Sequence, residues 1–293
     1  MQFTTSALAR AAAGLAFGLS LTTTAFAQAS MQHLADTVAQ VEDRLDARVG
    51  LVLTDTGSGQ TWTHRPEERF LMTSTAKAPI CGAVLARADA GTLSLTDELP
   101  VRDADILSYA PVTENRVGDS MTIAELCLAA VDMSDNTATN LLIDHLGGPQ
   151  AVTQFLRDSG DPVSRLDRRE PDLNTFAPGD ARDTSTPVAM ADMLHSLLLG
   201  EVLTPASRDQ LFDWMSHGGV TGALLRRTAP ADWRVADKSG GGEQTRSIVA
   251  LVTPTDGAPW VVTIFLSDAD ADFATRDAAL QDLSAAVIAA IRG

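Results

Sequence analysis

The two lysines of this chain are the first residues that call for a chemical explanation. The chain carries nearly all of its positive charge on arginine and keeps only Lys77 and Lys238. Arginine stays protonated near neutral pH, whereas burial or a nearby positive charge can lower the pKa of a lysine until it releases its proton. We therefore expect both lysines to do chemistry that a guanidinium cannot do.

Lys77 belongs to the run Ser74-Thr75-Ala76-Lys77, at the start of a helix that we expect to begin near Thr73. A spacing of three places Ser74 and Lys77 on the same face of one helical turn, where the serine can pass its proton towards the amine. The helix N-terminus adds partial positive charge and free N–H groups that stabilise an oxyanion. Alone, the run also fits a helix cap followed by a solvated lysine.

Two further motifs follow along the chain. Ser134-Asp135-Asn136 lies in a break between two expected helices, where it could also serve as the N-cap of a helix from Thr137. Lys238-Ser239-Gly240 stands at the end of an expected strand and could also be a turn. The three motifs in this order, with both lysines inside them, are hard to obtain by chance and indicate a serine nucleophile.

The hydrophobic pattern predicts the elements that must position these residues. Helical periodicity covers residues 31–48, 77–90, 122–131, 137–145 and 276–292, and strand patterns cover 49–55, 61–64, 234–238, 247–253 and 260–267. Residues 165–187 contain several prolines and little periodicity, which predicts an irregular Ω loop of the kind that often carries function.

Strands at both ends with helices between them predict an α/β (α+β) fold. We expect a five-stranded antiparallel sheet flanked by N- and C-terminal helices, with an inserted all-helical lobe. The α/β lobe would span about residues 28–68 and 217–293, and the helical lobe about residues 69–216. Together they would form one catalytic unit over residues 28–293.

The first 27 residues have the pattern of a cleavable signal peptide, with an apolar stretch followed by small residues at Ala25-Phe26-Ala27. We expect cleavage after Ala27 and a secreted, periplasmic protein. No later segment has the roughly 20 apolar residues of a membrane span. Two cysteines in a chain bound for an oxidising compartment suggest a single disulfide between Cys81 and Cys127.

The composition also limits the kinds of ligand and partner that the protein can bind. A formal net charge of −16 argues against nucleic acid, because phosphate binding needs clustered Lys and Arg. The five histidines are scattered and show no zinc-binding spacing. We expect no metal and no cofactor, and a monomeric protein that acts on a small molecule.

With these motifs in place, the chain resembles the class A β-lactamases, within the penicillin-recognising serine enzymes, whose signature combines Ser-x-x-Lys, Ser-Asp-Asn and Lys-Thr-Gly motifs. The third motif has Ser239 here where threonine is frequent, which keeps the hydroxyl. The resemblance runs from about Leu34 to the C-terminus. It includes the stretches 69–70, 81–85, 133–138, 165–168, 182–184 and 236–240.

The resemblance implies a role for each motif residue. Ser74 would attack the lactam carbonyl, the N–H groups of Ser74 and Gly241 would hold the oxyanion, and Lys77 would hydrogen-bond to Ser74. Ser134 would relay a proton to the lactam nitrogen. The residues implied in substrate binding are Tyr109, Asn136, Asn174, Lys238, Ser239, Gly240, Gly241 and Arg246.

The Ω loop carries Glu170-Pro171-Asp172-Leu173-Asn174, which by the resemblance would hold and activate the catalytic water. Whether Lys77 or Glu170 takes the serine proton stays open. A D-alanyl-D-alanine peptidase shares the three motifs but gives no reason for Glu170 and Asn174. A β-lactam sensor would need slow deacylation and a membrane anchor, so Glu170 and the cleavable signal peptide argue against this alternative.

The resemblance further implies an ion pair between Arg168 and Asp183 that closes the loop, and it agrees with a disulfide between Cys81 and Cys127. The segment 241–247 is one residue shorter than in close relatives, and Arg246 is the best candidate for the family's carboxylate-binding arginine. Neither Thr73 nor Gly242 is a cysteine, which excludes the active-site disulfide of one carbapenem-hydrolysing subgroup. We expect hydrolysis of penicillins and early cephalosporins.

Overall fold

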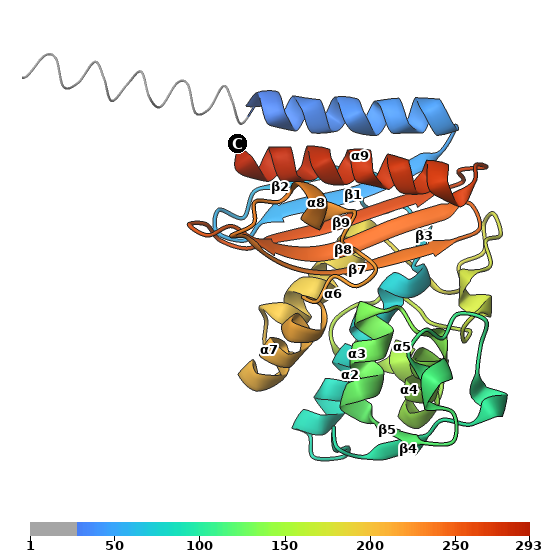
Figure 1. Cartoon of the computed structure of the whole chain (residues 1–293). Coiled ribbons are helices and arrows are strands. Elements are labelled where there is room, and N and C mark those ends of the chain that lie inside the picture. The colour runs from blue at the N-terminus through green and yellow to red at the C-terminus, as the bar shows by residue number, and fades with distance from the viewer. Residues whose placement is uncertain (1–27) are drawn as a thin grey trace, which may run out of the picture.

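The computed structural model describes residues 28–293, and the predicted signal peptide lies outside the described residues. One five-stranded antiparallel sheet organises the chain (Figure 1), in the order β2-β1-β9-β8-β7. Its strands are β1 (Arg48–Asp55), β2 (Thr61–His64), β7 (Arg234–Gly242), β8 (Thr245–Thr253) and β9 (Trp260–Ser267). The first and last strands of the chain pair directly, so the predicted sheet is confirmed.

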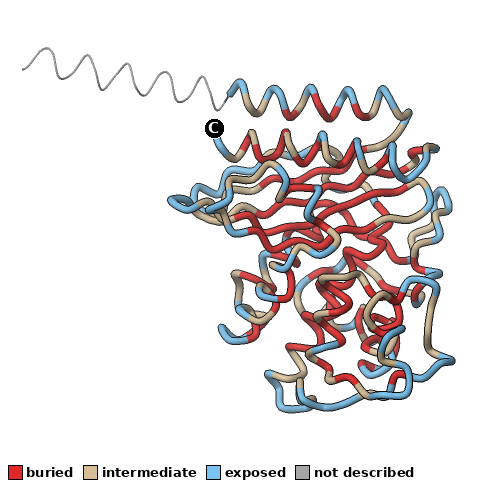
Figure 2. Tube along the Cα trace, viewed as in Figure 1, coloured by how far each residue is buried: buried red, intermediate tan, exposed pale blue. Residues whose placement is uncertain are grey.

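The terminal helices lie side by side on one face of this sheet (Figure 1). They are the helix over residues 28–45 and α9 (Phe273–Arg292), and α6 (Pro187–Leu198) packs on the opposite face. Alternate residues of β8 supply the two cores, with Ile248 and Ala250 on the side of the terminal helices and Val249 on the other. Because both faces are covered, strands β1, β9 and β8 are mostly buried (Figure 2), whereas the edge strand β2 is partly exposed.

The middle of the chain forms the inserted helical lobe. Its helices are α2 (Lys77–Asp89), α3 (Ile123–Asp132), α4 (Asn136–Leu146), α5 (Pro149–Asp158) and α7 (Pro205–Trp214), and the short α8 (Leu225–Thr228) follows. Short ladders join β3 (Phe70–Leu71) to β6 (Thr184–Ser185) and β4 (Glu98–Pro100) to β5 (Ser120–Thr122). The predicted boundaries near residues 69 and 216 stay a prediction, because α6 contacts both the sheet and α2.

Among residues 28–293, no helix combines the length and the apolar composition that a membrane crossing requires. Two predicted element limits need correction. The first helix ends by residue 45, and Arg48 already belongs to β1. The motif Lys238-Ser239-Gly240 lies inside β7 rather than at its end, because the strand continues to Gly242 and stays paired with β8. The glycines suggested a turn, but ladder hydrogen bonds use only backbone atoms.

The predicted disulfide is also corrected, since Cys81 and Cys127 are both free thiols. They face each other from α2 and α3 inside the apolar core, and neither is exposed. The Cys81 thiol donates to the backbone carbonyl of Cys127, with 3.8 Å between sulfur and oxygen. Burial raises the pKa of the Cys127 thiol, so the core holds it as a small neutral hydrophobe.

We expect native protein to expose no reactive thiol, because a buried thiol of raised pKa is inert. Unfolding in denaturant without reductant should release two thiols per chain in a titration with a chromogenic disulfide reagent. Reductant should leave the thermal midpoint unchanged. Denatured, unreduced protein that titrates no thiol would contradict this correction.

Candidate active site

Ser74 lies in a 3-10 turn, η1 (Thr73–Ala76), that leads directly into α2. Thr73 has a positive φ of 48°, which is strained for a β-branched residue and is held by the surrounding structure. The turn presses against β7, since a Cβ on Gly240 would lie 2.0 Å from Thr73 Oγ1. Glycine at 240 therefore allows the close approach that sets the nucleophile against the strand.

Lys77 is fully enclosed, and its ammonium binds three acceptors from two segments, the break before α4 and the Ω loop. Its Nζ lies 2.6 Å from Asn136 Oδ1, 2.8 Å from the Ser134 carbonyl and 3.0 Å from Glu170 Oε1. Within the described chain no hydrogen bond joins Lys77 to Ser74, contrary to the expected one, because the amine is directed at these acceptors. Burial lowers the pKa of Lys77, and the Glu170 carboxylate opposes that shift.

The Ser134 hydroxyl lies between the amines of Lys77 and Lys238, and these contacts bring the three motifs together. Its Oγ is 3.3 Å from Lys77 Nζ and 3.1 Å from Lys238 Nζ. Lys238 also donates to the Ser239 carbonyl at 2.7 Å. Burial, together with the charges of Lys77 and Arg246, lowers the pKa of Lys238 well below its usual range. The arrangement is a chain of proton-bearing groups along one wall of the site.

Asp135 fixes the backbone on which Ser134 and Asn136 stand. Its Oδ1 caps α4 by accepting from the N–H of Ala138 at 2.8 Å, and its Oδ2 accepts from the N–H groups of Val112 and Thr113. The motif thus supplies an N-cap as predicted, with Asp135 in that position and the helix beginning at Asn136 instead of Thr137. Asp135 also ties the break between α3 and α4 to the segment after Tyr109. The motif therefore caps α4 and also places Ser134 and Asn136 in contact with Lys77.

Glu170 is buried, and the Ω loop directs its carboxylate at Lys77. Asn174 Nδ2 donates to Glu170 Oε2. The backbone of Glu170 is clamped by Asn140, whose amide accepts from the Glu170 N–H and donates to its carbonyl, each at 2.9 Å. Asn174 Oδ1 is buried with no hydrogen-bond partner in the described chain. The two side chains therefore offer acceptor oxygens next to each other.

Arg168 and Asp183 form the ion pair that the resemblance implied for this loop, and the Asp183 carboxylate is fully buried. Asp183 has no exposed surface, and its Oδ2 lies 2.5 Å from Arg168 Nε. Its Oδ1 accepts from the backbone N–H groups of Asp167 and Arg168 at 2.7 and 2.9 Å. One carboxylate thus ties both ends of the loop together.

A cleft of about 550 Å³ opens in front of Ser74. It is lined by Ser74, Tyr109, Ser134, Asn136, Asn174, Val220, Ala223, Leu224, Ser239, Gly240, Gly241, Arg246, Phe273 and Asp277. These include every predicted substrate-binding residue except Lys238, whose buried amine lies 3.1 Å from the hydroxyl of the lining residue Ser134. Volume and lining suit a molecule of drug size.

Arg246 reaches the cleft but is already paired. Its guanidinium lies 2.8 Å from Asp277, donates to the Gly240 carbonyl at 2.8 Å and stacks on Phe273 at 5.1 Å. Sequence reasoning missed Asp277 and Phe273. Asp272, a typical N-cap residue, could have indicated both, because it starts α9 at Phe273, three residues before the predicted start at Arg276.

No cluster of His, Cys, Asp and Glu in residues 28–293 could hold a metal ion. What the site does assemble is a serine, two lysines of lowered pKa and a buried carboxylate around a cleft. Such groups suit acyl transfer, in which a nucleophile, proton carriers and a water-activating base act in turn.

Comparisons with known proteins agree with this chemistry. Residues 32–291 match the β-lactamase enzyme family. A β-lactamase of Rhodobacter capsulatus is 59% identical over 292 residues, covering all of both chains. A reconstructed last common ancestor of Gram-negative class A β-lactamases is 49% identical with a TM-score of 0.85, over 88% of this chain and 99% of its own.

A β-lactamase from Xanthomonas campestris is 44% identical with a TM-score of 0.85, over 88% of this chain and 97% of its own. The fold and the site define a serine hydrolase of the penicillin-recognising kind. The chain belongs to the class A β-lactamases and hydrolyses β-lactams.

Replacing Asp183 with Asn should lower the free energy of unfolding by about 2 kcal/mol or more, because it leaves the Arg168 guanidinium without its buried partner. The matched control is Asp180→Asn in the same loop, which breaks the exposed pair with Arg182 and should cost at most about 1 kcal/mol. Urea unfolding measures both. Equal losses in the two variants would contradict the importance of the buried pair.

Proposed function

We propose that this enzyme hydrolyses penicillins and early cephalosporins through an acyl-enzyme on Ser74, and that Glu170 and Asn174 direct the water that frees it. The observation that carries this proposal is the position of the Glu170 carboxylate, buried on the Ω loop between Lys77 Nζ and Asn174 Nδ2. A carboxylate in that position can receive the proton of a water held beside the ester.

In the acylation step, Ser74 Oγ attacks the lactam carbonyl and the C–N bond opens, while the serine proton leaves through Lys77 or Glu170. The N–H groups of Ser74 and Gly241 bind the oxyanion. Ser134 passes a proton to the lactam nitrogen, a role supported by its hydroxyl lying between Lys77 and Lys238. Lysines of lowered pKa exchange protons readily near neutral pH.

In the deacylation step, water attacks the ester carbonyl and Glu170 takes its proton. The vacant acceptor Asn174 Oδ1 supports this step, because a water bound there would sit beside the Glu170 carboxylate. The reciprocal bonds of Asn140 to the Glu170 backbone keep the carboxylate from turning away.

Substrate binding follows from the cleft lining. Lys238, Ser239 and Arg246 would face the substrate carboxylate, and Gly240 lets the backbone approach it. Asn136 would hold the side-chain amide through its Nδ2, since its Oδ1 already accepts from Lys77. Tyr109, which is exposed at the cleft mouth, would form an aromatic wall.

We further propose that residues 1–27 direct export to the periplasm, where the enzyme acts as a monomer and protects the cell from β-lactam antibiotics. The sequence of those residues supports export.

Glu170→Gln should accumulate acyl-enzyme, because glutamine keeps the size of the side chain but cannot accept the proton of the water. Intact-mass measurement after mixing with a penicillin should give a persistent adduct, and Ser74→Ala should give none. A Glu170→Gln enzyme that turns over at the normal rate would sink the proposed role of Glu170.

Arg246→Gln should lower kcat/KM for a penicillin roughly tenfold or more, as expected when a charged hydrogen bond to the substrate carboxylate is lost. Arg292→Gln is the matched control, because the Arg292 guanidinium donates to the neutral Thr228 carbonyl and Arg292 does not line the cleft. If the two variants behave alike, Arg246 does not bind the carboxylate.

A further inference from the structure

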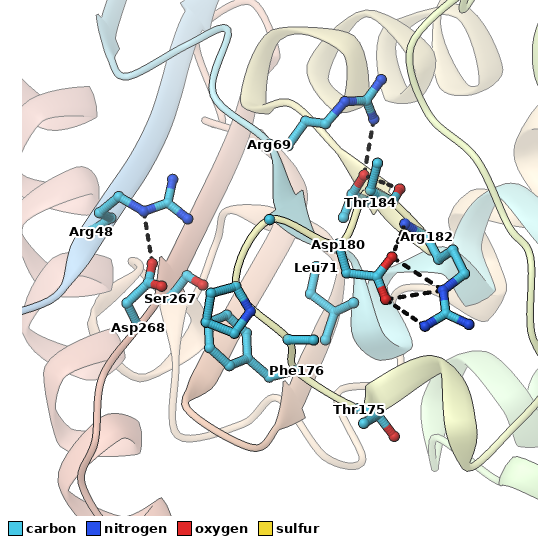
Figure 3. A pocket seen from close by; sticks show the side chains of 14 residues that line it. Arg48, Arg69, Leu71, Thr175, Phe176, Asp180, Arg182, Thr184, Ser267 and Asp268 are labelled. Atoms are coloured by element: carbon cyan, nitrogen blue, oxygen red, sulfur yellow. Dashed lines mark hydrogen bonds and ion pairs between the residues drawn. The ribbon is translucent and has the colours of Figure 1, made fainter.

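A second cavity lies behind the Ω loop, away from the lining of the catalytic cleft, and Figure 3 shows it from close by. Its volume is about 380 Å³, which falls in the range of small-molecule sites. The loop segment 175–182 forms one wall, and residues of β1, β3 and the end of β9 form the others. It shares no lining residue with the catalytic cleft.

The apolar part of this cavity comes mostly from the loop. Phe176, Ala177 and Pro178 lie on one side and Leu71 of β3 on another. Phe176 is only partly covered by the protein, so its ring has surface to offer an occupant. These side chains suit the flat apolar body of a small molecule.

The charged groups of the cavity are mostly paired with one another. Asp268 accepts from Arg48 at 2.7 Å, and Asp180 binds Arg182 at 2.7 Å, so these charges largely cancel (Figure 3). Arg69 differs, since within the described chain no carboxylate lies at ion-pair distance from it. Its guanidinium donates only to Thr184 Oγ1 at 2.9 Å and to the Val163 carbonyl at 3.1 Å.

Arg69 is exposed to solvent, and it brings a positive charge without a carboxylate partner in the described chain to the cavity lining. Two neutral acceptors use only part of the donor capacity of a guanidinium, whose planar fork fits a carboxylate. The chain as a whole has a net charge of −16, so a cavity whose lining carries three arginines and two aspartates is unusual on this molecule.

From these observations we infer that the cavity behind the Ω loop binds a small monocarboxylate with an aromatic or apolar body. The carboxylate lies against Arg69, and the body packs between Leu71 and Phe176. The ligand contacts the loop that carries Glu170 and Asn174, but it binds outside the catalytic cleft. The site does not depend on the function proposed above.

Isothermal titration of the purified protein with 2-naphthoate tests this inference. We expect saturable binding to one site, with Kd raised roughly tenfold in Arg69→Gln, because the charge-assisted hydrogen bonds are lost. Arg69→Lys keeps the charge and should lose less affinity. Arg227→Gln removes an arginine that also bonds only a neutral partner, and it should bind as the unmodified protein does.

Two comparisons separate this cavity from other ways of binding. Naphthoate held in the catalytic cleft would lose affinity in Arg246→Gln and keep it in Arg69→Gln, and that result would overturn the inference. So would equal binding of the neutral 2-naphthamide, or no saturable binding of naphthoate at all. Thermal unfolding of each variant verifies that it is folded, and Phe176→Ala, which leaves Arg69 intact, should also weaken binding.

Discussion

The buried contact between Lys77 and Glu170 is the constraint around which the rest of the site is arranged. An ammonium and a carboxylate without access to water destabilise a fold unless each is paired and hydrogen-bonded. The contact of 3.0 Å, with the Ser134 carbonyl and Asn136 as further acceptors, meets this requirement. It holds together three segments that are distant in the sequence: the start of α2, the break before α4 and the Ω loop.

The surrounding structure can be understood as support for that contact. Asp183 fixes the ends of the loop, and Asn140 fixes the backbone of Glu170. On the opposite side, β7 brings Lys238 to the same serine hydroxyl that Lys77 reaches. A rigid frame of this kind fits an enzyme that must position a nucleophile, a proton relay and a water in one small space.

Much of this could be predicted from the sequence, because the determining signals are local. The strands follow from β-branched runs, and Ser74, Ser134 and Lys238 follow from motifs of fixed spacing. The predictions failed where tertiary context decides the outcome. The glycines after Ser239 suggested a turn, but pairing with β8 continues the strand. An even cysteine count suggested a bond, yet Cys81 and Cys127 are thiols in an apolar core. The pairing of Arg246 with Asp277 depends on how α9 meets the sheet, which no local pattern encodes.

The central claim is that Glu170 and Asn174 act together in deacylation. The most direct test measures acylation and deacylation separately. Stopped-flow measurement of a penicillin reaction gives acylation and deacylation rate constants for the unmodified enzyme and for Asn174→Leu, which keeps the volume but removes the amide. In Asn174→Leu, deacylation should slow by roughly tenfold or more while acylation changes much less. Equal slowing of both steps, or no slowing of deacylation, would contradict it.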